Sequence, residues 1–169
     1  MSESAKARYR SAKPSTAYKA PTEGLLHVVF EYGEGMKPGS FKTMMESMAE
    51  HMAATLKHGG PEASKAIKKA QAPSYIDSEL EEPTGEAATR RANLRFDMEW
   101  KEWWQKKKTW TDNSGKIFEK LSSHCAPTMK TKLRGMEVWT AIEESQDGIG
   151  MVKLLHRVYF NTDGSKQSM

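Results

Sequence analysis

The sequence predicts an all-α protein, a bundle of five or six helices with one long helix, an extended N-terminal segment and disordered ends. Apolar residues recur at helical spacing in several stretches, and in the longest of them Phe96, Trp103, Trp110 and Ile117 lie seven residues apart. One short stretch, residues 25–33, has the apolar and β-branched character of a strand. Proline and glycine separate these stretches, and no sizeable sheet is expected.

The longest helix is expected over about residues 88–125. Trp100 and Leu121 join the seven-residue repeat, so one face of this helix is aromatic over about six turns. We expect this face to form core, and an exposed aromatic surface that binds a partner is the alternative. Residues 112–115 favour helix poorly, so a kink or break near Asn113 is the alternative to one continuous helix.

Length and composition indicate one domain with part of the chain unpacked. The chain has 169 residues, of which 37% are hydrophobic and 28% are charged. Cys125 is the only cysteine, which excludes a disulfide within the chain and fits a reducing compartment. The sequence has no apolar run near the roughly 20 residues of a membrane span, and no apolar secretory block at its start. We therefore expect a soluble cytoplasmic protein without membrane contact.

The net charge of +4 is concentrated in residues 1–20, which we call the basic arm. This segment has five cationic residues against one carboxylate, Glu3, so the charges of the remaining chain balance. Its small and polar residues have little to bury, and we expect it to be disordered. Such an arm can bind RNA phosphates by counterion release, although a leader without a partner is the open alternative. The candidate nucleic-acid-binding residues are Lys6, Arg8, Arg10, Lys13 and Lys19.

Residues 21–72 are expected to hold an extended segment and two helices. Residues 25–33 form a short strand or a docked extended segment. Ser40 is the expected N-cap of a helix with a methionine stripe, which is core or, alternatively, an adaptable groove. Pro61 begins the next helix, which Pro73 closes.

The second half of the chain follows an acidic linker, residues 73–86. Residues 87–161 are expected to contain the long helix, a short helix over residues 127–135 and a last helix that Asp147 caps. The last helix is apolar on most sides, so it is either central to the bundle or covered by another chain. Residues 162–169 form a polar, frayed tail. The candidate core or interface residues are Phe96, Trp100, Trp103, Trp110, Ile117, Leu121, Ile149, Val152, Leu155 and Tyr159.

Few residues suggest catalysis. His124 and Cys125 are a possible base and nucleophile, but adjacent residues on a helix point about 100° apart and no third group orients them. We interpret Cys125 as a small buried hydrophobic residue at a helix end. We therefore expect no enzyme activity, no cofactor and no metal.

One ordered set of features extends from residue 24 to residue 160. A GLLHVVFEYG segment comes early, followed by a tryptophan-rich helix, a His-Cys pair, a short helix, an acidic stretch and a last apolar helix. This order resembles the Gag polyprotein of copia-type LTR retrotransposons, in its N-terminal part. The positions that carry the resemblance are Trp110, Asn113, Lys116, His124, Cys125, Met129, Leu133, Met136, Glu143, Glu144, Asp147, Leu154, Leu155, Val158 and Phe160.

The resemblance implies a capsid-like protein that self-associates into virus-like particles and contacts RNA, with residues 87–161 as its helical capsid-like core. The single cysteine departs from the family, because the zinc knuckle that follows the family's capsid needs three. The chain also stops near the point where the family continues into a second helical half. We therefore expect the N-terminal capsid part or a truncated remnant.

The function predicted from the sequence is self-association through helical faces, with nonspecific RNA contact through the basic arm. Apolar bands on the methionine-rich helix and the last helix are the expected contact faces. A monomeric helical adaptor that uses the methionine and tryptophan faces is the alternative. A helical enzyme is a third possibility, and it needs a pocket around His124, Cys125 or His156.

Overall fold

The computed structural model describes residues 18–34 and 36–160, and within them the protein is all-α. The described part has six α-helices and no strand beyond one isolated bridge. This confirms the predicted fold class. The helices are α2 (Pro38–Thr55), α3 (Gly60–Lys69), α4 (Arg90–Ser123), α5 (Pro127–Arg134), α6 (Trp139–Ser145) and α7 (Gly148–Phe160).

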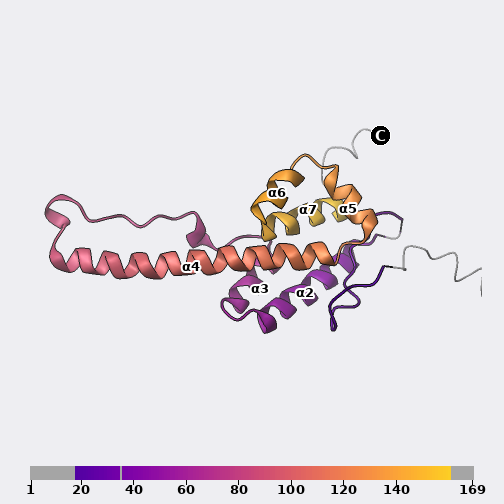
Figure 1. Cartoon of the computed structure of the whole chain (residues 1–169), viewed down its shortest axis with the longest axis horizontal. Helices are drawn as coiled ribbons and strands as arrows, with labels where there is room; N and C mark the ends of the chain where they lie inside the picture. Colours follow the sequence, from indigo (N-terminus) through magenta and orange to yellow (C-terminus); the bar gives the residue numbers. More distant parts are fainter. Residues whose placement is uncertain (1–17, 35, 161–169) are drawn as a thin grey trace, which may run out of the picture.

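The long helix α4 organises the arrangement (Figure 1). In this view its C-terminal half crosses the bundle, with α2 and α3 below it and α5, α6 and α7 above it. Helix α7 packs against α4 and also contacts α2 and α3. Its N-terminal half extends beyond the bundle, and the segment that joins α3 to α4 runs out beside it. This segment contains two short 3-10 turns, η2 (Ser74–Ile76) and η3 (Gly85–Ala87).

Helix α4 is continuous over 34 residues, so the break considered near Asn113 does not occur. Thr89 caps its start, because the Thr89 hydroxyl accepts a hydrogen bond from the backbone N–H of Ala92. Asn113 and Ser114 are buried in mid-helix, and both side chains bond to other parts of the bundle. Tertiary hydrogen bonds therefore outweigh the poor helix propensity of this stretch.

The N-terminal segment docks on the bundle as expected, with turns at residues 22–28 followed by one short bridge. The backbone N–H of Phe30 donates to the carbonyl of His124, and the N–H of Ala126 donates to the carbonyl of Phe30, both at 2.9 Å. These bonds form the isolated parallel bridge between Phe30 and Cys125. The Phe30 ring is fully buried, so the segment is part of the core.

Two helix starts were predicted with different success. The N-cap of α2 is Lys37, and Pro38 takes the first turn, so the predicted Ser40 cap was wrong. Proline suits this position because its fixed φ matches the helix and it has no N–H to satisfy. The Asp147 cap of α7 is confirmed, because the Gly150 N–H donates to its carboxylate at 2.9 Å.

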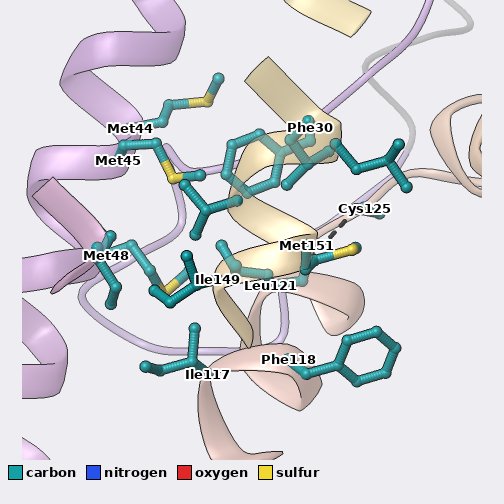
Figure 2. Packing of buried hydrophobic residues seen from close by; sticks show 14 of the residues in the cluster. Phe30, Met44, Met45, Met48, Ile117, Phe118, Leu121, Cys125, Ile149 and Met151 are labelled. Carbon is teal, nitrogen blue, oxygen red and sulfur yellow. Dashed lines mark hydrogen bonds between the residues drawn. The ribbon is translucent and has the colours of Figure 1, made fainter. Parts of the chain in front are cut away.

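One hydrophobic core joins the parts before and after the acidic linker. Side chains of α2, α4 and α7 interdigitate in it, including Met48, Ile117 and Ile149 (Figure 2). The methionine stripe of α2 is buried, and so is the apolar band of the last helix. The residues concerned are Met44, Met45, Met48, Met52, Ile149, Val152, Leu155 and Tyr159. These bands are therefore largely core within one copy.

Most of the basic arm lies outside the described residues, and so does the predicted frayed tail. Lys6, Arg8, Arg10 and Lys13 are among the residues that the structure does not describe. Lys19 is exposed, and Ala20 is buried. The Tyr18 hydroxyl donates to the carbonyl of Ser123, so residues 18–20 already belong to the folded part.

Candidate functional site

The feature that distinguishes the surface is the part of the molecule that extends from the bundle, residues 73–109, which we call the projection (Figure 1). It consists of the acidic linker, residues 73–86, the connecting residues 87–89, and residues 90–109 of α4. The linker runs beside this half of α4, and the chain then turns back and enters the helix at its N-cap, Thr89. Few elements of the same copy can therefore cover this part of α4.

The aromatic face of α4 is buried where the helix lies in the bundle and partly exposed where the helix extends beyond it. Trp110, Ile117 and Leu121 are buried, as the core interpretation predicted. Phe96 and Trp103 are half-buried, and Trp100 is 44% exposed, so the core interpretation was wrong for the N-terminal half. A seven-residue repeat shows which residues share a face, but it does not show how far along the helix a partner extends.

Tyr75 fixes the base of the acidic linker. Its carbonyl accepts a hydrogen bond from the Trp103 indole N–H at 3.3 Å, and its hydroxyl donates to the carboxylate of Glu62 on α3. Burial, together with this carboxylate, raises the pKa of the Tyr75 hydroxyl above its ordinary value. The linker is thus attached to α3 and α4 at once.

The outer face of the projection carries two apolar pairs, each one helical turn apart. Leu94 is 55% exposed and Met98 is 73% exposed, while Trp100 and Trp104 are 44% and 46% exposed. The Trp100 and Trp104 rings are nearly parallel, at 17°, with their centroids 6.4 Å apart. The ammonium of Lys108 lies 5.4 Å from the Trp104 ring centroid, a cation–π distance. Trp100 was among the predicted residues, whereas Leu94, Met98 and Trp104 lie off the aromatic face and were not predicted.

Opposite charges divide the two parts of the projection. The linker has five exposed carboxylates and no lysine or arginine. The helical half has seven cationic residues against three carboxylates. The carboxylates of the linker are Asp77, Glu79, Glu81, Glu82 and Glu86, and the cations of the helix are Arg90, Arg91, Arg95, Lys101, Lys106, Lys107 and Lys108.

His124 and Cys125 are placed where they hold the N-terminal segment. His124 is fully buried, with Nδ1 2.7 Å from the Val28 carbonyl oxygen and Nε2 2.9 Å from the Thr22 hydroxyl. Burial lowers the pKa of His124. Burial also raises the pKa of the Cys125 thiol to about 12, and this thiol donates to the carbonyl of Leu121 at 3.3 Å. The burial predicted for Cys125 is confirmed, whereas the His124 contacts were not foreseen.

One groove lies between α2, α3 and α7. Its lining includes the apolar Phe41, Met45, Val152 and Phe160 and the charged Lys42, Glu46, Glu50 and Lys68. Among the four methionines of the α2 stripe, Met45 alone lines this groove. All four are buried, so the core interpretation of the stripe is confirmed, and Met45 in addition reaches this groove.

Within residues 18–34 and 36–160, no cluster of three or more His, Cys, Asp or Glu residues could hold a metal ion. The described helices also include none that is both long and apolar enough to span a membrane. No family model matches the chain, and no curated protein or solved structure matches it either.

Proposed function

We propose that this chain is a Gag-like capsid protein whose copies associate into particles and contact RNA nonspecifically. The observation that carries the proposal is the outer face of the projection, where Leu94, Met98, Trp100 and Trp104 are exposed beyond the bundle. An exposed apolar group of this kind is typical of a surface that another chain covers. The resemblance in the order of sequence features gives the class of assembly.

The projection replaces the contact faces expected from the sequence. The bands on α2 and α7 are already buried in one copy, so they offer little area to a neighbour. Tryptophan is enriched at protein interfaces because it covers a large area and loses few rotational states on binding. Trp100 and Trp104 are the two exposed tryptophans among the described residues.

The association test compares the wild type with a Met98→Ser/Trp104→Ser variant. Sedimentation velocity over a range of concentrations, and negative-stain microscopy at the highest, should show larger species for the wild type alone. Leu26→Ser is the matched control, because Leu26 is 64% exposed but lies outside the projection. A wild type that stays monomeric at all concentrations, with and without RNA, would contradict the proposal.

The basic arm supplies the proposed RNA contact. Neutralising phosphates requires lysine and arginine but no base-specific residue, so affinity should fall steeply with salt. The residues concerned are Lys6, Arg8, Arg10, Lys13 and Lys19. Deleting residues 1–17 should remove most of the affinity and most of the salt dependence, measured by fluorescence anisotropy on unrelated RNA sequences. The deletion stops before Tyr18 because Tyr18 bonds to Ser123.

A monomeric adaptor is the second candidate, and the groove between α2, α3 and α7 favours it. An apolar groove with Phe41, Met45 and Val152 in its lining is a form that an amphipathic partner helix fits. Light scattering separates the two candidates, because an adaptor keeps the mass of one chain at every concentration.

A further inference from the structure

We propose that two copies of this chain pair through their projections, with the acidic linker of each copy on the outer face of α4 of the other. This inference rests on the proposed self-association and specifies one of its contacts, the one that joins copies in pairs. The proposed contact involves the face of α4 that the bundle leaves exposed, the carboxylates of the linker and the lysines of the helix. The pairing is two-fold, because each copy contributes the same two parts.

The outer face of α4 combines apolar and cationic side chains. At 3.6 residues per turn, Lys101 and Lys108 lie between the Leu94–Met98 pair and the Trp100–Trp104 pair. Both lysines are exposed. An occupant of this face must therefore bring anionic groups to the lysines and cover the apolar pairs at the same time.

The acidic linker of a second copy has this chemistry. Its five carboxylates are exposed, and no cation of the same segment opposes them. It is an extended segment with proline near both ends, and its backbone is attached to its own copy at Tyr75. A segment that is already positioned loses less conformational freedom when it docks than a free peptide does.

The dimensions of the projection fit a weak but specific contact. The 20 helical residues from Arg90 to Thr109 extend about 30 Å and are about 10 Å across. With the linker beside them, one face offers on the order of 600 Å² per copy, so a pair buries about 1,200 Å², the lower end for specific interfaces. We therefore expect pairing that is reversible and visible mainly at high protein concentration.

RNA is the competing occupant of this face, and the observations favour it less. Tryptophans beside lysines can stack on bases and neutralise phosphates. However, Leu94 and Met98 are the most exposed apolar side chains of this face, and they offer no ring to a base. The five carboxylates of the linker, along the same projection, would also repel phosphates.

A charge-exchange experiment tests the pairing. One variant carries Glu79→Lys/Glu81→Lys/Glu82→Lys, and the other carries Lys101→Glu/Lys108→Glu. Sedimentation equilibrium at low salt should show the dissociation constant of each variant raised at least about tenfold over that of the wild type. An equimolar mixture should recover association between unlike variants. Glu143→Lys/Glu144→Lys, exposed on α6, is the matched control and should leave the wild-type value unchanged.

The other outcomes overturn the inference in distinguishable ways. If Met98→Ser/Trp104→Ser abolishes association while both charge variants associate normally, the linker is not the occupant and the proposed function stands. If the wild type never associates, the proposed function fails together with the pairing. If the wild type is monomeric but an RNA oligonucleotide quenches its tryptophan fluorescence, and Lys101→Glu/Lys108→Glu abolishes the quenching, the face binds RNA instead.

Discussion

The side-chain amide of Asn113 donates a hydrogen bond to the carbonyl oxygen of His58 at 2.7 Å. Asn113 lies in the middle of α4, and His58 lies in the turn between α2 and α3. Gly59 allows this close approach, because its φ of +69° is in the left-handed region and a Cβ there would lie 2.9 Å from the Asn113 amide nitrogen. This contact holds the α2–α3 pair against the long helix.

Replacing Asn113 with alanine should lower the free energy of unfolding by about 1 to 2 kcal/mol. The variant removes a buried donor and leaves the His58 carbonyl without this partner. Urea unfolding followed by circular dichroism measures the change. Asn93→Ala is the control, because Asn93 is exposed on the same helix. Equal stabilities of the two variants would show that the Asn113 contact adds nothing.

Gly148 is the point at which α7 crosses α4. Its N–H donates to the Ser114 hydroxyl at 2.9 Å, and a Cβ at Gly148 would lie 2.5 Å from the Ser114 carbonyl oxygen. Gly148→Ala should therefore separate the two helices and lower the free energy of unfolding by roughly 1 to 3 kcal/mol.

Gly39→Ala is the control for Gly148→Ala, because we expect it to change stability in the opposite direction. Gly39 lies in the first turn of α2 with nothing within 4 Å of an added Cβ. Alanine there restricts the unfolded chain and favours helix, so stability should rise by about 0.4 to 1 kcal/mol. Thermal unfolding should show opposite shifts for the two variants, and shifts of the same sign would contradict this account.

The buried ring of His124 predicts a loss of stability in acid. Its folded-state pKa is lowered, chiefly by burial, so the unfolded chain binds the extra proton more readily. The stability that the neutral ring contributes should be fully present above about pH 6.5, the ordinary pKa of histidine. The free energy of unfolding should then fall as the pH drops below this value and through the lowered pKa of the folded state. His51, whose pKa is also lowered mainly by burial, acts in the same direction.

Urea unfolding at about pH 7.5 and about pH 5 tests this sign. His124→Gln should be less stable than the wild type at the higher pH, because the ring bonds to Val28 and Thr22 are lost. It should also show a smaller fall in stability between the two values. His58→Gln, at an exposed side chain, is the matched control. An unchanged pH dependence in His124→Gln would rule out His124 as its source.

The helices could be predicted from the sequence because their apolar spacing and their boundaries are local properties. Asp147 caps α7 and Pro127 begins α5 as expected, since a cap and a first-turn proline act within one turn. Ser40 misled because Pro38, two residues earlier, already satisfies the first turn of α2. Each of these outcomes depends on residues next to each other in the chain.

The candidate site depended on long-range packing, which the sequence does not display. Whether Trp100 and Trp110 share one environment depends on where α2, α3 and α7 end beside α4, and the residues of α4 do not contain that information. The bond between Tyr75 and Trp103, across 28 residues, places the acidic linker along the helix. The spacing of the tryptophans thus predicted a face, and only the packing of the other helices showed which half of it is exposed.

Cys125 should resist thiol reagents as long as the protein is folded. Its side chain is fully buried and burial raises the pKa of the thiol to about 12, so the reactive thiolate is scarce and inaccessible. Labelling with an aromatic disulfide reagent that releases a coloured thiolate should proceed only through unfolding. Its rate should be about a thousandfold or more lower than in strong denaturant. Thr140→Cys, exposed on α6, should add one thiol that reacts at once. Immediate reaction of one full equivalent in the folded wild type would show that Cys125 is accessible and that the bridge between Phe30 and Cys125 opens readily.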